Sequence, residues 1–193
     1  MDTSLHMSAQ PQTPLAMNAQ KFALWLFLVS VVLLFGALTS AYIVKVSETG
    51  TLGISLPTIF LWNSALIVCS SVTAQLAYHF AKKDQLAKVK MMLVASAVLG
   101  IAFIYGQLLA WDDLMAMNIN FVGNPAGSFI YVFTGVHVAH LVSAIVFLLI
   151  MLYAAFRFKV HSRKLDRMEM FVTYWHFLGG LWIYLYVFLN YYN

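Results

Sequence analysis

The run MMLVASAVLGIAFIYGQLLAW, residues 91–111, carries no charged side chain over 21 positions. An α-helix rises 1.5 Å per residue, so about 20 apolar residues cross the roughly 30 Å hydrocarbon core of a bilayer. The run is continuous rather than alternating, and an isolated strand would leave its backbone groups unsatisfied in lipid. It therefore predicts a transmembrane helix, which we expect to extend over residues 88–114.

Four further stretches meet the same length requirement, at residues 22–45, 57–81, 127–159 and 168–191. Hydrophobic residues make up 62% of the 193 and charged residues only 9%, well below the roughly one quarter of a soluble domain. The sequence predicts an all-α membrane protein in which residues 21–193 form a bundle of five transmembrane helices. Residues 1–20 are polar, lack the basic segment of a signal peptide, and are expected to form a flexible cytoplasmic tail.

The distribution of Lys and Arg predicts the orientation. Only Lys45 falls on one side of the predicted membrane, and the other ten fall on the opposite side: Lys21, Lys82, Lys83, Lys88, Lys90, Arg157, Lys159, Arg163, Lys164 and Arg167. Lys and Arg concentrate in cytoplasmic loops, so we expect the N-terminus in the cytoplasm and the C-terminus outside. The net charge of +4 is explained by this anchoring, and we expect no nucleic-acid partner.

Several hydrogen-bonding side chains lie within the predicted spans. By helix rise, Asn63 and Gln107 come roughly 9 and 10 Å below the outer membrane surface, on adjacent helices. We therefore expect their amides to hydrogen-bond across the helix interface. Together with Ser70, Ser71 and Thr73, they are interpreted as helix-packing polar residues.

Three histidines are predicted to converge near the bilayer midplane. His137 and His140 are spaced i, i+3 on the fourth span, and His176 on the fifth comes close to the depth of His140. They could form a buried polar node that orders the helices or a lipid headgroup, ligate haem or a metal, or relay protons. The carboxylates Asp112, Asp113 and Glu169 lie at the membrane boundaries, none lies deeper in a span, and the only cysteine is Cys69, which disfavours the last two readings. We predict no metal site.

Two segments resemble signature motifs of subunit III of the haem–copper terminal oxidases. Residues 134–141, TGVHVAHL, resemble the motif G-[FVT]-H-x-x-H-[VL] of that family. Residues 174–177, YWHF, followed by Trp182, resemble its Y-W-H-F-x-x-x-x-W signature. Weaker agreement comes from Asn63 with residues 70–73, and from Gly100, Phe103 and Gln107.

This resemblance implies a five-helix, non-catalytic subunit of a proton-pumping cytochrome c oxidase that reduces O2 to water in the bacterial inner (plasma) membrane. It implies subunits I and II as partners, with haem and copper in those subunits and no cofactor in this chain. Bound structural phospholipid and membership of a larger respiratory supercomplex are compatible with it. The lipid-binding site or buried polar node would comprise His137, His140, Tyr174, Trp175 and His176.

Three departures from the family pattern each remove a carboxylate, because Val31, Ala110 and Gly179 stand where the family often has Glu or Asp. A proton-handling role is therefore not carried over to this chain. Three alternative functions remain open at this point. They are a membrane cytochrome b with a bis-histidine haem, the accessory subunit of a quinol oxidase or nitric oxide reductase, and a small transporter or channel.

Overall fold

The computed structural model describes residues 19–49, 56–119, 121–122, 125–157 and 165–192. These residues form five helices and no strand: α1 (Ala19–Thr49), α2 (Ile59–Lys82), α3 (Leu86–Ala116), α4 (Pro125–Phe156) and α5 (Asp166–Tyr192). Each helix is long and apolar enough to cross a membrane. The predicted five-helix all-α bundle is confirmed, and the predicted spans differ from the helices by only a few residues at their ends.

Most of the predicted tail, residues 1–18, and part of the predicted end of the fourth span, including Lys159, lie outside the described residues. Ala19 and Gln20 belong to α1 and not to the tail. We call the end of the bundle that carries Lys21, Lys82, Lys88 and Arg157 the basic end. Its assignment to the cytoplasm stays a prediction.

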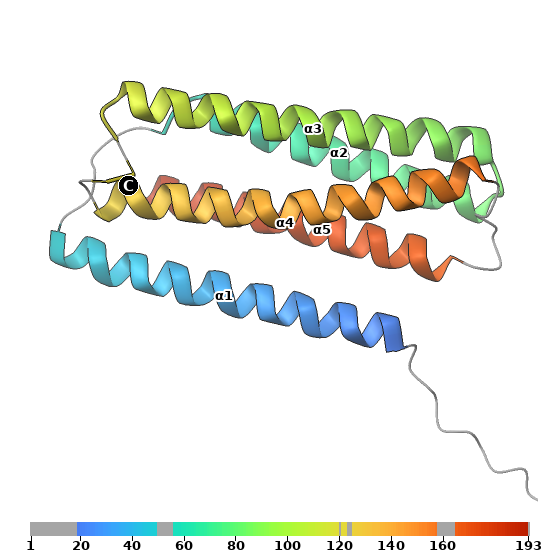
Figure 1. The fold of residues 1–193 in the computed structure, drawn as a ribbon, viewed down its shortest axis with the longest axis horizontal. Coiled ribbons are helices and arrows are strands. Elements are labelled where there is room, and N and C mark those ends of the chain that lie inside the picture. The colour runs from blue at the N-terminus through green and yellow to red at the C-terminus, as the bar shows by residue number, and fades with distance from the viewer. Residues whose placement is uncertain (1–18, 50–55, 120, 123–124, 158–164, 193) are drawn as a thin grey trace, which may run out of the picture.

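The connection between α2 and α3 is a tight turn at the basic end. Only Lys83, Asp84 and Gln85 separate the two helices. Asp84 has a φ of 53°, in the left-handed region that Asp and Asn enter more readily than most residues. The chain thus reverses directly, and α2 and α3 pack side by side along their length (Figure 1).

The five helices are not equally buried. α5 contacts α1, α2 and α4, and half of its most apolar window is buried in the bundle. Among the described helices, α1 contacts only α4 and α5, and 22% of its window is buried. Figure 1 shows α1 along one side of the other four helices. α5 is therefore the centre of the described fold, and α1 is a peripheral helix with an exposed apolar flank.

A stripe of α1 nevertheless packs on the bundle. Leu28, Val31, Phe35 and Tyr42 are buried at the spacing of one helix face. The Tyr42 ring contacts Phe129 and Phe133 of α4 and Phe188 of α5, with ring centroids 5.6–5.8 Å apart. This aromatic cluster holds α1 at the end of the bundle opposite to the basic end.

Candidate functional site

Two tryptophans of α5 attach it to α2. The Trp175 indole N–H donates to Ser70 Oγ and the Trp182 indole N–H to Ser64 Oγ, each at 3.1 Å. Both indoles are 1% exposed, and a buried indole N–H requires an acceptor. The pairs are antiparallel, because the later tryptophan meets the earlier serine. These bonds fix the register of α5 on α2.

Ser70, which accepts the hydrogen bond from the Trp175 indole, also links α2 to α3. Ser70 Oγ donates to the backbone carbonyl of Ser96 at 3.3 Å, and the Thr73 and Ser96 hydroxyls lie 2.7 Å apart. The Trp175 ring enters this interface because α3 has no side chain at Gly100, where a Cβ would lie 3.0 Å from the indole Cη2. Small residues thus allow one tryptophan to bridge three helices.

The predicted amide pair is confirmed. Asn63 Nδ2 donates to Gln107 Oε1 at 3.4 Å, and both side chains are almost completely buried. Gly106 makes room for the pair, since a Cβ there would overlap Asn63 Oδ1. The remaining amide nitrogen, Gln107 Nε2, has no hydrogen-bond partner among the described residues.

His137 is fully buried between α3 and α5. Its ring lies 5.8 Å from the Phe103 ring and 5.1 Å from the Trp182 ring, measured between centroids. Neither ring nitrogen has a hydrogen-bond partner in the described part of the chain. Aromatic rings of α3 and α5 therefore pack beside this imidazole.

The other two histidines face different helices. His140 Nδ1 lies 2.8 Å from the Val136 carbonyl oxygen, and its ring packs 6.0 Å from both Phe27 and Phe35 of α1. His176 Nε2 lies 3.0 Å from Gln75 Oε1 of α2. The predicted convergence of three imidazoles is therefore wrong as a single cluster.

The reason is rotation about the helix axes rather than depth. His137 and His140 differ by about 60° around α4 at 3.6 residues per turn, enough for one to face α3 and the other α1. His176 follows the inward-facing Trp175, so about 100° separates the two side chains. Within the described residues, no group of three or more His, Cys, Asp or Glu side chains is placed to hold a metal ion.

Tyr174, the remaining member of the predicted node, joins α5 to α4. Its hydroxyl lies 2.6 Å from Ser143 Oγ and donates to the His140 carbonyl at 3.1 Å. Reasoning from the sequence missed Ser143 because hydroxyl side chains are common in membrane helices and carry no individual signal. Trp111 is a further link between helices that was not predicted, because its indole donates to Thr134 Oγ1 at 2.9 Å.

Two apolar grooves flank α5. One, of about 430 Å³, lies between α2 and α5, and the other, of about 440 Å³, lies between α1 and α5. His176 and Gly180 line both. Of the five residues predicted to bind lipid or form the node, only His176 lines either groove. Trp175 and Tyr174 are buried in helix packing.

The three positions that lack the family's carboxylate are all buried. Val31 is 2% exposed and Ala110 is fully buried. A Cβ at Gly179 would lie 2.9 Å from Ser71 Oγ, so a side chain there requires Ser71 to move. Neighbouring helices pack directly against the small or apolar residues at these three positions.

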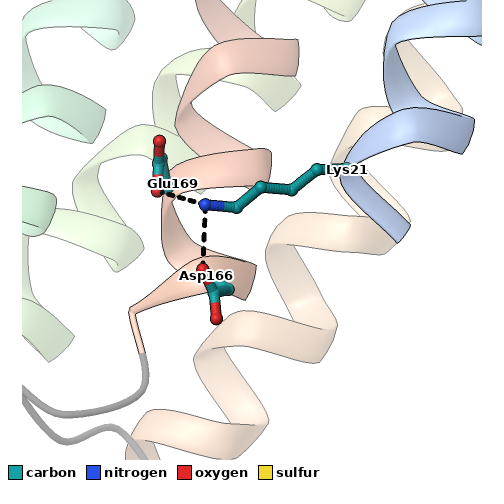
Figure 2. Close-up of polar contacts among 3 residues, drawn as sticks. All are labelled: Lys21, Asp166 and Glu169. Atoms are coloured by element: carbon teal, nitrogen blue, oxygen red, sulfur yellow. Dashed lines mark hydrogen bonds and ion pairs between the residues drawn. The ribbon is translucent and has the colours of Figure 1, made fainter. Parts of the chain in front are cut away.

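An ion cluster at the basic end was not predicted (Figure 2). Lys21 Nζ lies 2.8 Å from Asp166 Oδ1 and 3.0 Å from Glu169 Oε2. Asp166 and Glu169 occupy the first turn of α5, where the helix dipole favours negative charge. The signal available in the sequence was that α1 and α5 start at the same membrane surface, which brings their first turns together.

Comparison with known proteins gives a consistent result. Residues 7–193 match the family model described as "Cytochrome c oxidase subunit III". The chain is 25% identical over 180 residues to subunit 3 of the cytochrome bo(3) ubiquinol oxidase of Buchnera aphidicola subsp. Schizaphis graminum, which covers 90% of this chain and 95% of that protein.

Two further relatives carry different names. Cytochrome c oxidase subunit 3 of Myxine glutinosa is 27% identical over 186 residues, covering 91% of this chain and 70% of that protein. A probable quinol oxidase subunit 3 of Staphylococcus saprophyticus is 22% identical over 175 residues, covering 88% of this chain and 87% of that protein.

Proposed function

Because the chain belongs to the cytochrome c oxidase subunit III family, we propose that it is a non-catalytic subunit of a proton-pumping oxidase of the cytochrome c type. In this role it packs against subunit I, which with subunit II carries the haem and copper, and stabilises the complex in the bacterial inner membrane. The complex reduces O2 to water, and this chain contributes no redox centre. Membership of a larger respiratory supercomplex is part of the same proposal.

The observation that carries the supporting role is how the buried polar groups are used. The indoles of Trp175 and Trp182, the Asn63–Gln107 pair and the Tyr174 hydroxyl all bond to side chains or carbonyls of neighbouring helices. Such bonds fix the helices relative to one another. A rigid scaffold of this kind suits a subunit that braces a partner.

We extend the proposal to bound phospholipid, with acyl chains in the two grooves beside α5. Both grooves have almost entirely apolar linings with His176 as a shared polar group. Their volumes fall in the range of roughly 300–1,000 Å³ that is typical of ligand sites. We therefore propose His176, rather than His137 or His140, as the residue that contacts the lipid.

A quinol oxidase is the second candidate, because the relatives include subunits of both types of oxidase. Two of the three relatives described above are subunits of quinol or ubiquinol oxidases. Purification of the complex in mild detergent would separate the two proposals, by comparing oxidation of reduced cytochrome c with oxidation of ubiquinol.

The supporting role is tested by replacing Trp175 with Phe, which removes the indole N–H and keeps an aromatic ring. The expected result is less subunit I co-purified with the variant chain and faster loss of oxidase activity. Trp62→Phe is the matched control, because it makes the same substitution at a tryptophan of α2 that is 70% exposed. Equal recovery of subunit I from the Trp175→Phe and Trp62→Phe variants would reject the supporting role.

A further inference from the structure

The cations at the basic end are divided between two sides of the bundle. On the side of α1 and α5, Lys21 lies against both Asp166 and Glu169 (Figure 2), and Arg167 is the second cation, so the formal charge of this side is 2 − 2 = 0. On the side of α2, α3 and α4 lie five cations: Lys82, Lys83, Lys88, Lys90 and Arg157. The described residues at these three helix ends include one carboxylate, Asp84. The formal charge of that side is therefore 5 − 1 = +4.

Four of these cations lie over aromatic rings. The Lys82 ammonium is 4.4 Å from the centre of the Tyr78 ring, and the Lys88 ammonium is 5.1 Å from that of Phe80. Lys90 lies over Phe156 and the Arg157 guanidinium over Tyr153, at 5.1 and 5.4 Å. These distances are within cation–π range.

The aromatic rings restrict where the charged groups lie along the helix axes. Tyr153 and Phe156 are more than half exposed on the outside of α4, as expected of aromatic side chains at a membrane surface. An ammonium group has three N–H donors, and a ring below it engages only one side. Long basic side chains at the ends of membrane helices commonly place their charge at the level of the headgroups, and we expect these cations to do the same.

We propose that the basic ends of α2, α3 and α4 form a binding surface for anionic phospholipid headgroups of the adjacent leaflet. The ligand is a lipid whose headgroup carries one phosphate negative charge. Lys82, Lys83 and Lys88 bind this phosphate. The tight α2–α3 turn brings these three residues together, and Lys90 and Arg157 continue the surface onto α4. This site is separate from the grooves beside α5, where acyl chains rather than headgroup charge would determine binding.

The full chain, purified in mild detergent, is offered equimolar dioleoyl-phosphatidylglycerol and dioleoyl-phosphatidylcholine, and bound lipid is counted by native mass spectrometry. We expect at least a tenfold preference for the glycerol lipid, decreasing as salt rises. Lys82→Gln, Lys83→Gln and Lys88→Gln together should abolish most of it, because each cation near an anionic surface contributes about a fivefold factor. Replacing the same three residues with Arg should preserve it.

Lys21→Gln is the matched control, since it removes a cation from the same end of the bundle but from the side that carries Asp166 and Glu169. It should leave the preference unchanged. Equal binding of the two lipids by the wild-type chain would overturn the proposal even if the triple variant does not fold. So would displacement of the lipid by excess inorganic phosphate under conditions where chloride at the same ionic strength does not displace it, which would indicate a site for the free ion.

One further outcome would assign the surface to an acidic protein segment instead. In that case the triple Gln variant would lose co-purifying subunits while its lipid preference stayed the same. Oxidase activity is not a readout here, so failure of this proposal and failure of the proposed function are distinguishable.

Discussion

Replacement of Gly106 by Ala should destabilise the bundle, although Ala is the better helix former. The added Cβ overlaps Asn63 Oδ1, so Asn63 must rotate away and its bond to Gln107 is lost. An interhelical hydrogen bond in a membrane protein contributes about 0.6 kcal/mol, up to about 1.7. A buried amide left without a partner costs about 1–3 kcal/mol, and Gln107 is fully buried.

Helix propensity acts in the opposite direction, because Gly is less favourable than Ala in a helix by up to about 1 kcal/mol. The net expectation is a loss of about 1–3 kcal/mol in the free energy of unfolding. Gly36→Ala and Gly180→Ala are matched controls, since a Cβ at either position meets nothing within 4 Å. They should be neutral or slightly stabilising.

The assay is reversible unfolding of the purified chain in mixed micelles by increasing SDS, followed by tryptophan fluorescence. A double-mutant cycle with Asn63→Ala isolates the cause. In the Asn63→Ala background the overlap is gone, so Gly106→Ala should cost nothing or become stabilising. If Gly106→Ala alone is as stable as the wild-type chain, or if its cost persists without Asn63, the packing argument fails.

Three other perturbations follow from the contacts. Trp175→Phe and Ser70→Ala should show a coupling energy of about 0.6–1.7 kcal/mol in a double-mutant cycle, and independent effects would mean that the 3.1 Å bond does not stabilise the helix pair. Gly179→Asp should lower the free energy of unfolding by about 1–3 kcal/mol, the usual cost of overpacking, because its Cβ would lie 2.9 Å from Ser71 Oγ, and Gly180→Asp should cost less because its neighbourhood is open. Lys21→Met should lower the melting temperature slightly in low salt and not in high salt, since exposed ion pairs are screened, and an equal loss in both would point to packing of the lysine stem.

The spans and one polar contact could be predicted because they depend on position along the helix axis. Counting apolar residues located all five helices, and rise per residue placed Asn63 opposite Gln107. The histidine cluster failed because it needed the angle around the axis as well. Depth brought the three imidazoles to one level, but packing turned His137 toward Phe103 and Trp182, and His176 toward Gln75.

The serine acceptors could not be chosen from the sequence for a related reason. α2 carries Ser64, Ser70 and Ser71, and which of them meets an indole depends on the rotation of α2 against α5. That rotation is set by the fit of large rings against small residues such as Gly100. The rotation can be determined only when the positions of all the neighbouring helices are known.

The peripheral position of α1 has a consequence for how the chain is made. Its contacts are with α4 and α5 alone, which are the last helices to leave the ribosome. From Thr49 to Phe156, the end of α4, there are 107 residues, which take about 5–20 s to synthesise at 5–20 residues per second. During that interval α2 and α3 can pair through their tight turn, while α1 is already inserted and has none of its partner helices. α1 therefore joins the bundle after α2 and α3 although it is inserted before them, and a chain that stops before α4 leaves α1 without a partner helix.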